Sequence, residues 1–289
     1  MKKLLSIKPA ARQHWVGDGF PVRNAFSYDE GAKLSPFLYL DYAGPVAFPP
    51  SEHRRGVGPH PHRGFETVTI VYSGEVEHRD SGGGCGIIRA GDVQWMTAAS
   101  GIVHEELHGP YFAKSGGVFE MIQLWINLRA KHKKAPPGYQ TIRDTKIPRV
   151  ELPSGAGLVR VIAGSFQGIE GPAHTYSPVN VWDVRLARGA TVEFEVRAGW
   201  TAALFVLSGA VQFGPGEVAQ SAELAVFERE GESFIAEALE ETRLLFLSGE
   251  PIDEPIVGQG PFVMNTMAEI EQAVADYRAG RMGRLAAHA

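Results

Sequence analysis

The sequence predicts an all-β protein built from two similar β domains. Its 34 glycines and 19 prolines, among 289 residues, separate short runs rich in β-branched and aromatic side chains. Many short strands with closely spaced turns indicate a sandwich or a barrel. Residues 204–211 also echo residues 69–76, because both runs are mostly apolar, pass through Ser-Gly and resume with a valine two residues later. An internal repeat of this kind favours a duplicated domain.

Five strand candidates support the first domain. They are rich in β-branched, aromatic and other apolar residues, and glycine-containing turns punctuate them. The turn at Ser73-Gly74 joins two of them as a turn-linked pair. The candidates are residues 67–72, 75–80, 86–89, 93–96 and 119–128.

A second set of strand candidates begins near residue 157. These candidates are residues 157–164, 179–186, 191–196 and 204–211. The stretch 134–155 between the two sets contains Pro136-Pro137-Gly138 and Pro153-Ser154-Gly155, so we place the linker there. We therefore expect one domain at residues 1–135 and a second at residues 136–289.

The only strong helical pattern lies near the C-terminus. Asn265-Thr266 offers an N-cap, and Glu269 stands three residues after Thr266, as in a capping box. The apolar positions that recur with helical spacing are Ile270, Ala273, Val274 and Tyr277. We expect the second domain to end in this short helix, which stops at Gly280.

Composition narrows the function classes. The net charge of −5 and the pI near 6.1 argue against direct binding to nucleic acid or to an anionic membrane. The basic run 131–134 precedes prolines and is expected to be a solvated loop. The single cysteine, Cys85, excludes an intrachain disulfide and fits a reducing compartment. No stretch has the roughly twenty apolar residues that a membrane span needs, so we expect a cytoplasmic protein.

Four residues form the most informative pattern. His60 and His62 are spaced i,i+2, and so are His104 and Glu106, which places each pair on one face of an extended strand. Three imidazoles and one carboxylate make a site for a divalent transition metal. Four such ligands in an octahedron leave two positions open, whereas structural zinc sites are usually closed and rich in sulfur. The ligand set therefore favours a reactive site and Fe(II) over zinc.

The residues alone leave the carboxylate ligand open. Strict alternation would also put Glu66 on the face of His60 and His62, although Gly64 between them could carry a bulge that turns Glu66 away. Glu105 points away from His104 by alternation, which leaves Glu106 as the other candidate.

Several long motifs resemble the pirin family of the cupin superfamily. The resemblance runs nearly end to end through residues 19–23, 36–45, 60–68, 74–81, 91–96, 101–104, 249–257 and 260–266. It implies a bicupin, that is, two β-barrels of the double-stranded β-helix or jelly-roll type, with Fe(II) in the N-terminal barrel. It also implies that the metal ligands are His60, His62, His104 and Glu106, rather than Glu66. Ni, Mn, Co, Cu or Zn are the alternative metals.

The repeat offset of 135 residues, applied without gaps, predicts that the second domain lacks a metal site. It maps His60 and His62 onto Glu195 and Arg197. It maps His104 and Glu106 onto Leu239 and Glu241. No histidine lies near these positions.

The pirin resemblance implies two kinds of activity. Some members cleave flavonols as quercetin 2,3-dioxygenases, with a flavonol and dioxygen as substrates, and others are iron-dependent partners of transcription factors. In the first case Glu106 would be both metal ligand and catalytic base for the flavonol 3-hydroxyl. In the second case the protein would act through protein partners without turnover. A third possibility is a metal-bound cupin that acts on another small molecule. Candidate pocket walls are Phe48, Phe65, Trp95 and Met96.

Overall fold

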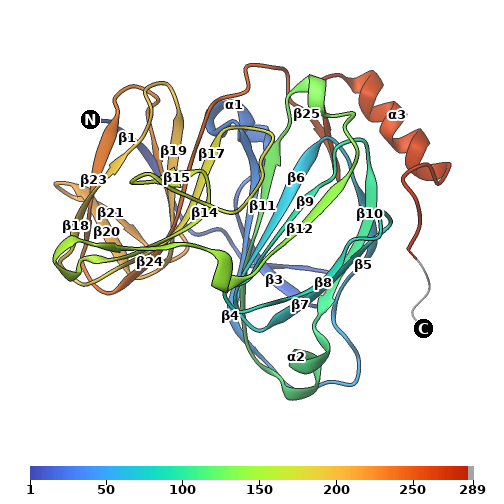
Figure 1. Ribbon diagram of the computed structural model, residues 1–289, viewed down its shortest axis with the longest axis horizontal. Coiled ribbons are helices and arrows are strands. Elements are labelled where there is room, and N and C mark those ends of the chain that lie inside the picture. Colours follow the sequence, from blue (N-terminus) through green and yellow to red (C-terminus); the bar gives the residue numbers. More distant parts are fainter. Residues whose placement is uncertain (286–289) are drawn as a thin grey trace. The chain divides into compact units, whose positions relative to one another are not determined.

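The computed structural model describes residues 1–285 and consists of two compact β units (Figure 1). The first barrel comprises Arg12–Ala32, Phe37–Asp144 and the chain from Ile252 onward. The second barrel comprises Met1–Ala11, Lys33–Pro36 and Thr145–Pro251. This arrangement confirms the predicted all-β bicupin.

The first barrel pairs a seven-stranded sheet with a four-stranded sheet, and every pairing within them is antiparallel. The larger sheet has the order β12 (Gly138–Ile142), β9 (Val93–Thr97), β6 (Phe65–Ser73), β11 (Gly117–Asn127), β4 (Phe37–Phe48), β3 (Phe20–Phe26) and β2 (His14–Val16). The smaller sheet has the order β5 (Gly56–His62), β10 (Ile102–His108), β7 (Glu75–Asp80) and β8 (Cys85–Arg89). Short helical turns at η1 (Tyr28–Glu30), α2 (Pro110–Ser115) and η2 (Ala130–His132) connect the strands.

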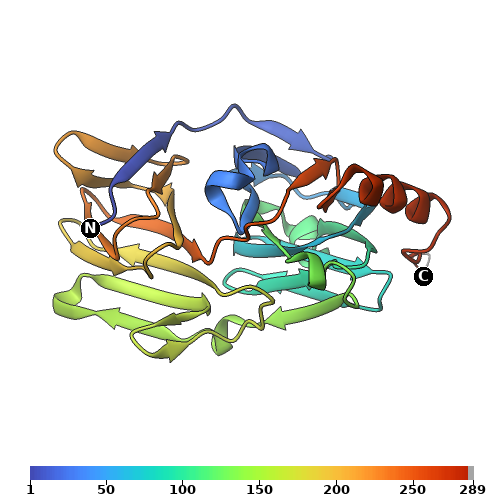
Figure 2. The ribbon, with the colours of Figure 1, turned by 90° about the horizontal axis from the view of Figure 1, so that it is seen from above.

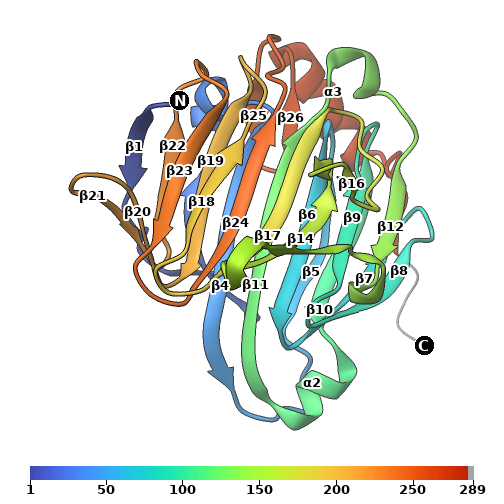
Figure 3. The ribbon, with the colours of Figure 1, turned by 60° about the vertical axis from the view of Figure 1, so that its left-hand side comes forward.

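The second barrel repeats this seven-plus-four plan (Figure 3). Its larger sheet has the order β1 (Leu4–Lys8), β22 (Leu224–Phe227), β19 (Thr201–Ser208), β24 (Thr242–Gly249), β17 (Val179–Leu186), β14 (Gly157–Ala163) and β13 (Arg149–Leu152). Its smaller sheet has the order β18 (Thr191–Glu195), β23 (Ser233–Ala238), β20 (Ala210–Gly214) and β21 (Glu217–Gln220). Further short elements are α1 (Gly31–Leu34), η3 (Asp144–Lys146), η4 (Pro153–Gly155) and the ribbon β15 (Ser165–Phe166) with β16 (Ile169–Glu170).

The sequence echo corresponds to the same local structure in both barrels. Gly74 joins β6 to β7, and Gly209 joins β19 to β20. Their φ angles of 87° and 91° lie in the left-handed region, which glycine adopts without steric cost. Each barrel also has its own apolar core, led by residues such as Phe119 in the first and Phe246 in the second. The duplicated domain predicted from the repeat is thus present in the topology as well.

The two units are not contiguous in sequence. Strand β1, at the N-terminus, pairs with β22 of the second barrel. Helix α3 (Met267–Arg278), at the C-terminus, packs on β25 (Val257–Gln259) and β26 (Phe262–Met264) of the first barrel (Figure 2). The division at residues 135 and 136 stays a prediction of domain bounds, but the compact units differ from it at both ends of the chain.

The C-terminal helix has the predicted capping box. The Thr266 side chain accepts from the Glu269 backbone N–H, and the Glu269 carboxylate accepts from the Thr266 N–H. Ile270 and Ala273 are the buried apolar positions of this helix, as the helical spacing indicated. Among residues 1–285, no helix combines the length and the apolar character that crossing a bilayer requires.

The basic run 131–134 differs from the expected solvated loop at one position. Lys131 and Lys134 are exposed, but Lys133 is only 2 % exposed. Its ammonium nitrogen donates to the carbonyls of Gly64 and Val263 and to the side chain of Asn127. These three acceptors replace part of the hydration that the lysine loses on burial, which is why the prediction is wrong at this residue.

Candidate metal centre

Strand pairing in the smaller sheet of the first barrel brings the predicted ligands together. β10 lies between β5 and β7 and pairs antiparallel with both. His104 stands directly opposite His60 on β5, and His62 stands opposite Ile102, two positions along. A register shift between His104 and Glu106 marks a β-bulge, a feature that commonly re-aims side chains next to functional sites.

The three histidines converge. The ring centroid of His104 lies 4.2 Å from that of His60 and 4.9 Å from that of His62, and the His60 and His62 rings are 5.0 Å apart. Each offers one nitrogen within 4.8 Å of the nitrogens of the other two. Three imidazole nitrogens at this separation can share one divalent ion.

The Nδ1 atoms of the three rings are already engaged, which leaves the Nε2 atoms for a ligand. His60 Nδ1 lies 2.8 Å from the Gly58 carbonyl oxygen, and His62 Nδ1 lies 3.3 Å from that of Pro261. His104 Nδ1 lies 3.3 Å from His78 Nδ1. His104 Nε2 is buried without a hydrogen-bond partner. A buried orphan nitrogen is costly unless something binds it, so this donor set fits a metal ion.

Burial keeps two of these imidazoles neutral. It lowers the pKa of His62 and of His104 well below 6.5, and the neighbouring imidazoles lower both further. Only the neutral imidazole has a lone pair for a metal, so both rings are ready to bind at neutral pH.

Glu106 lies next to this cluster rather than fully within it. Its carboxylate forms a second group of possible ligands with His104 and His78, again within 4.8 Å. One carboxylate oxygen lies 3.0 Å from the Thr69 hydroxyl and 3.4 Å from Gln94 Nε2. The structure therefore brings three of the four predicted ligands together and places the fourth beside His104, held by polar side chains of the barrel interior.

The two competing glutamates lie elsewhere. Glu66 is buried and accepts a 2.7 Å hydrogen bond from Thr97, outside both ligand groups. Gly64 ends the alternation before it, because its φ of 94° turns the chain from β5 into a strand of the other sheet. A Cβ at this position would lie 1.9 Å from the Val263 carbonyl oxygen, so only glycine fits. Glu105 faces away, as alternation predicts, and it is buried in an ion pair with Arg79.

Among the four candidate pocket walls, Phe65 lies beside the histidine cluster. The Phe65 ring lies 5.2 Å from the His62 ring. Phe48 packs instead in the apolar core of the first barrel, and Trp95 and Met96 are fully buried. Trp125 is an aromatic neighbour that the sequence did not reveal: its ring stacks on Phe65 at 4.3 Å and lies 5.1 Å from His62.

His78 is a neighbour of the cluster whose facing the sequence could not fix. It is fully buried, and its ring lies 5.2 Å from that of His104. The signal was its i,i+2 spacing from Asp80 on β7, which places both side chains on one face. The sequence did not indicate which of the two faces of β7 that was.

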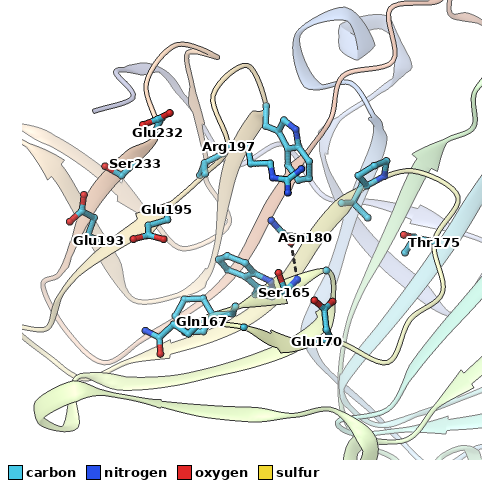
Figure 4. A pocket seen from close by; sticks show the side chains of 18 residues that line it. Ser165, Gln167, Glu170, Thr175, Asn180, Glu193, Glu195, Arg197, Glu232 and Ser233 are labelled. Atoms are coloured by element: carbon cyan, nitrogen blue, oxygen red, sulfur yellow. Dashed lines mark hydrogen bonds between the residues drawn. The ribbon is translucent and has the colours of Figure 1, made fainter.

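The second barrel has a cavity of about 910 Å³ lined by different chemistry (Figure 4). Glu195 and Arg197, the positions that the repeat aligns with His60 and His62, both line it. Glu193 and Glu232 line it as well. Among residues 1–285, the groups of three metal-ligating side chains that were found both lie in the first barrel.

Known proteins match this chain over nearly its full length. A family model described as Pirin matches residues 19–126, and one described as Pirin C-terminal cupin domain matches residues 181–283. A Pseudomonas aeruginosa protein named "Putative quercetin 2,3-dioxygenase PA2418" is 55% identical over 98% of this chain and 99% of its own. Human pirin is 36% identical over 97% of this chain and 94% of its own. The crystal structure of a quercetin 2,3-dioxygenase from Acinetobacter baumannii has a TM-score of 0.96 and 50% identity, and covers 99% of this chain and 100% of that one. These matches, together with the two barrels and the histidine cluster, show that the chain belongs to the pirin family.

Proposed function

We propose that the first barrel binds one divalent metal ion, Fe(II) foremost, and that the protein cleaves a flavonol with dioxygen. The ligands would be the Nε2 atoms of His60, His62 and His104, together with the Glu106 carboxylate. The observation that supports this most is the convergence of three imidazoles on a buried His104 Nε2 that has no protein partner. The quercetin 2,3-dioxygenase named among the solved structures, at 50% identity, supports the substrate class.

A bound Fe(II) would supply Lewis acidity toward the flavonol hydroxyl oxygen and a redox couple for the reaction with dioxygen. The protein's own contribution begins with Glu106, whose carboxylate oxygen would take the proton of the flavonol 3-hydroxyl. Thr69 and Gln94 hold that carboxylate in place. The retained proton is then available to the product when the ring has opened and carbon monoxide has left.

Aromatic side chains beside His62 suit a planar substrate. Trp125 stacks on Phe65 on one side and on Tyr39, at 4.7 Å, on the other. Trp125 and Tyr39 remain partly exposed, whereas Phe65 is buried. The stack therefore offers a partly open aromatic surface next to a metal ligand, against which a flavonol ring can pack.

An absorbance assay tests the proposal. Protein reconstituted with Fe(II) is mixed with quercetin in air, and loss of the flavonol's visible absorbance is followed together with carbon monoxide release. We expect turnover by the wild type and none by the double variant His60→Ala/His104→Ala. The matched control is His53→Ala, since His53 is an exposed histidine of the same barrel.

Two results would contradict the enzyme proposal: no turnover by metal-loaded wild type, or equal turnover by the double variant. Metal content is measured on the same samples. A wild type that holds about one metal per chain without turnover would favour the alternative of a metal-dependent binding protein. A wild type that holds no transition metal would overturn the ligand assignment itself.

A further inference from the structure

We propose that Asp80 and His78 act as positioning residues for the metal centre, by fixing the tautomer of His104 that leaves the Nε2 lone pair free for the metal. The inference rests on the metal site proposed above. Asp80 and His78 lie on β7, and His104 lies on the neighbouring strand β10. The three side chains form a continuous buried chain of contacts.

The chain of contacts begins at Asp80. One of its carboxylate oxygens accepts hydrogen bonds from the backbone N–H groups of Gly82 (2.7 Å) and Gly84 (2.9 Å). The other carboxylate oxygen lies 3.1 Å from His78 Nε2. An ionised carboxylate only accepts hydrogen bonds, so His78 Nε2 must carry the proton and donate it to Asp80.

The proton on His78 Nε2 decides what its other nitrogen does. In a neutral imidazole one nitrogen donates and the other accepts, so His78 Nδ1 is an acceptor. It faces His104 Nδ1 at 3.3 Å. His104 must therefore donate from Nδ1, and its Nε2 is left with a lone pair and no hydrogen. Nε2 is also the atom of His104 that has no partner in the protein.

Packing holds the His78 ring in the orientation that this chain needs. The Tyr139 ring stacks on it at a centroid distance of 4.7 Å and an interplanar angle of 16°. The His78 side chain is fully buried. The ring therefore cannot exchange its two nitrogens without displacing Tyr139 and breaking the contact with Asp80.

The same contacts argue against His78 as a metal ligand, although it belongs to the group with His104 and Glu106. Both of its nitrogens are engaged, one by Asp80 and one by His104. The Nδ1–H groups of His60 and His62, by contrast, face backbone carbonyls. His104 is thus the ligand whose tautomer is controlled by a side chain, and substitution can change it.

The tautomers can be read directly in metal-free protein labelled with ¹⁵N-histidine. Long-range ¹H–¹⁵N spectra, assigned with single histidine variants, are expected to show His104 protonated at Nδ1 and His78 protonated at Nε2. The variant Asp80→Asn keeps an oxygen for the Gly82 and Gly84 N–H groups but presents an amide N–H₂ to His78. We therefore expect it to shift the proton of His104 to Nε2. Wild-type His104 protonated at Nε2 would overturn the inference.

Metal affinity gives the second readout. We expect Asp80→Asn to weaken the binding of Ni(II), and of Fe(II) without oxygen, about 10–100-fold in a chelator competition, the range known for changes to groups that orient metal ligands. The matched control is Asp92→Asn. Asp92 is also a buried carboxylate that accepts backbone N–H groups in a turn of the same barrel, but its side-chain partner is Arg143 rather than a histidine. The metal affinity of Asp92→Asn should equal that of the wild type.

A second pair of variants separates orientation from simple packing. His78→Gln retains a side-chain oxygen that can accept from His104 Nδ1, whereas His78→Leu does not. We expect the glutamine variant to bind metal more tightly than the leucine variant. Equal and undiminished affinity in Asp80→Asn and His78→Leu would overturn this inference alone, while a wild type that binds no metal would overturn the proposed function and leave the tautomer measurement standing.

Discussion

At the scale of single residues, two neighbouring glutamates on β10 have opposite surroundings. Glu106 faces the histidine cluster and is held by Thr69 and Gln94, whereas Glu105 forms an ion pair with Arg79. The alternation of a β-strand produces this difference between adjacent residues. They therefore form a natural pair for testing which carboxylate takes part in chemistry.

Glu106→Gln should abolish most of the turnover. The amide keeps an oxygen for the Thr69 hydroxyl but can neither accept the substrate proton nor bring negative charge to the metal. We expect the turnover rate of metal-loaded protein to fall at least about 100-fold, the lower range for loss of a general base. Glu105→Gln, corrected for the fraction of folded protein, should retain activity within a few-fold. Similar losses in both variants would argue against Glu106 as the base.

Lys133 is a second residue with an unusual environment. Burial lowers the pKa of its ammonium group from 10.5 to about 7. The unfolded chain then binds more protons than the folded chain between about pH 7 and pH 10.5. Stability contributed by this residue must therefore rise with pH across that window and stay constant below it.

Lys133→Met should remove this pH dependence. The free energy of unfolding of wild type minus that of Lys133→Met is expected to increase from pH 7 to pH 9.5, by at most about 1.4 kcal/mol per pH unit. Urea unfolding at several pH values measures it. Lys134→Met, at the exposed neighbouring position, should show no such trend relative to wild type. If the free energy of unfolding changed with pH in the same way for wild type and Lys133→Met, the lowered pKa of Lys133 would be refuted as the cause.

At the scale of elements, the C-terminal hairpin and helix hold the segment that carries His62. The backbone of Arg63 pairs with that of Phe262 of β26 in an isolated β-bridge, and the Pro261 carbonyl oxygen faces His62 Nδ1. The Arg63 guanidinium also donates to Asp276 of α3 at 2.7 Å. The C-terminal hairpin and helix thus help to orient His62, a proposed metal ligand that lies 199 residues before Pro261 in the sequence.

The Arg63–Asp276 pair should contribute stability that disappears in acid. Hydrogen bonding from Arg63, and then from Arg281, lowers the pKa of Asp276 to about 2, against an ordinary value of 3.8. The contribution is therefore complete above pH 4 and is lost as the pH falls towards 2. We expect Asp276→Asn to lower the Tm of metal-free protein at pH 6, and the difference to narrow by pH 3. The control Glu271→Gln, on the exposed side of the same helix, should leave the Tm unchanged. A Tm difference between wild type and Asp276→Asn that stays constant with pH would contradict the proposed role of the Arg63–Asp276 pair.

At the scale of the whole molecule, two barrels with the same strand plan carry different interiors. The positions of His60 and His62 correspond to Glu195 and Arg197 beside the cavity of the second barrel. A ligand that binds only the folded state stabilises it by about 2.7 kcal/mol at a concentration of 100 times Kd. Because the proposed ligands all lie in the first barrel, this stabilisation should be local.

Hydrogen exchange followed by mass spectrometry can locate the metal's effect. Adding Ni(II), or Fe(II) under argon, should slow exchange most in β5 and β10, which carry the proposed ligands. Strands β17 and β24 of the second barrel should change little. The double variant His60→Ala/His104→Ala serves as the control and should show no metal-dependent protection. Protection centred on the second barrel would place the metal elsewhere.

Local patterns predicted much of this structure from the sequence. Alternation and glycine turns located β6 to β9 and β11 in the first barrel and β14 and β17 to β20 in the second, and the capping box located α3. The i,i+2 pairs His60/His62 and His104/Glu106 identified the strands whose register brings three imidazoles together. Three features could not be predicted because they depend on residues that lie far away in the sequence. Lys133 is buried against the carbonyl of Val263, and His78 is oriented by His104 on β10. Helix α3 is tied to the first barrel through the contact of Asp276 with Arg63.

The contact between His62 and Pro261 also joins two residues that the ribosome makes at very different times. The two residues are 199 positions apart. At a translation rate of 5–20 residues per second, the ribosome adds Pro261 roughly 10–40 s after His62. The proposed ligand His62 is therefore made well before the hairpin that can fold against it. The proposed metal site can therefore take its complete form only after the hairpin that carries Pro261 has been made, long after the histidines themselves.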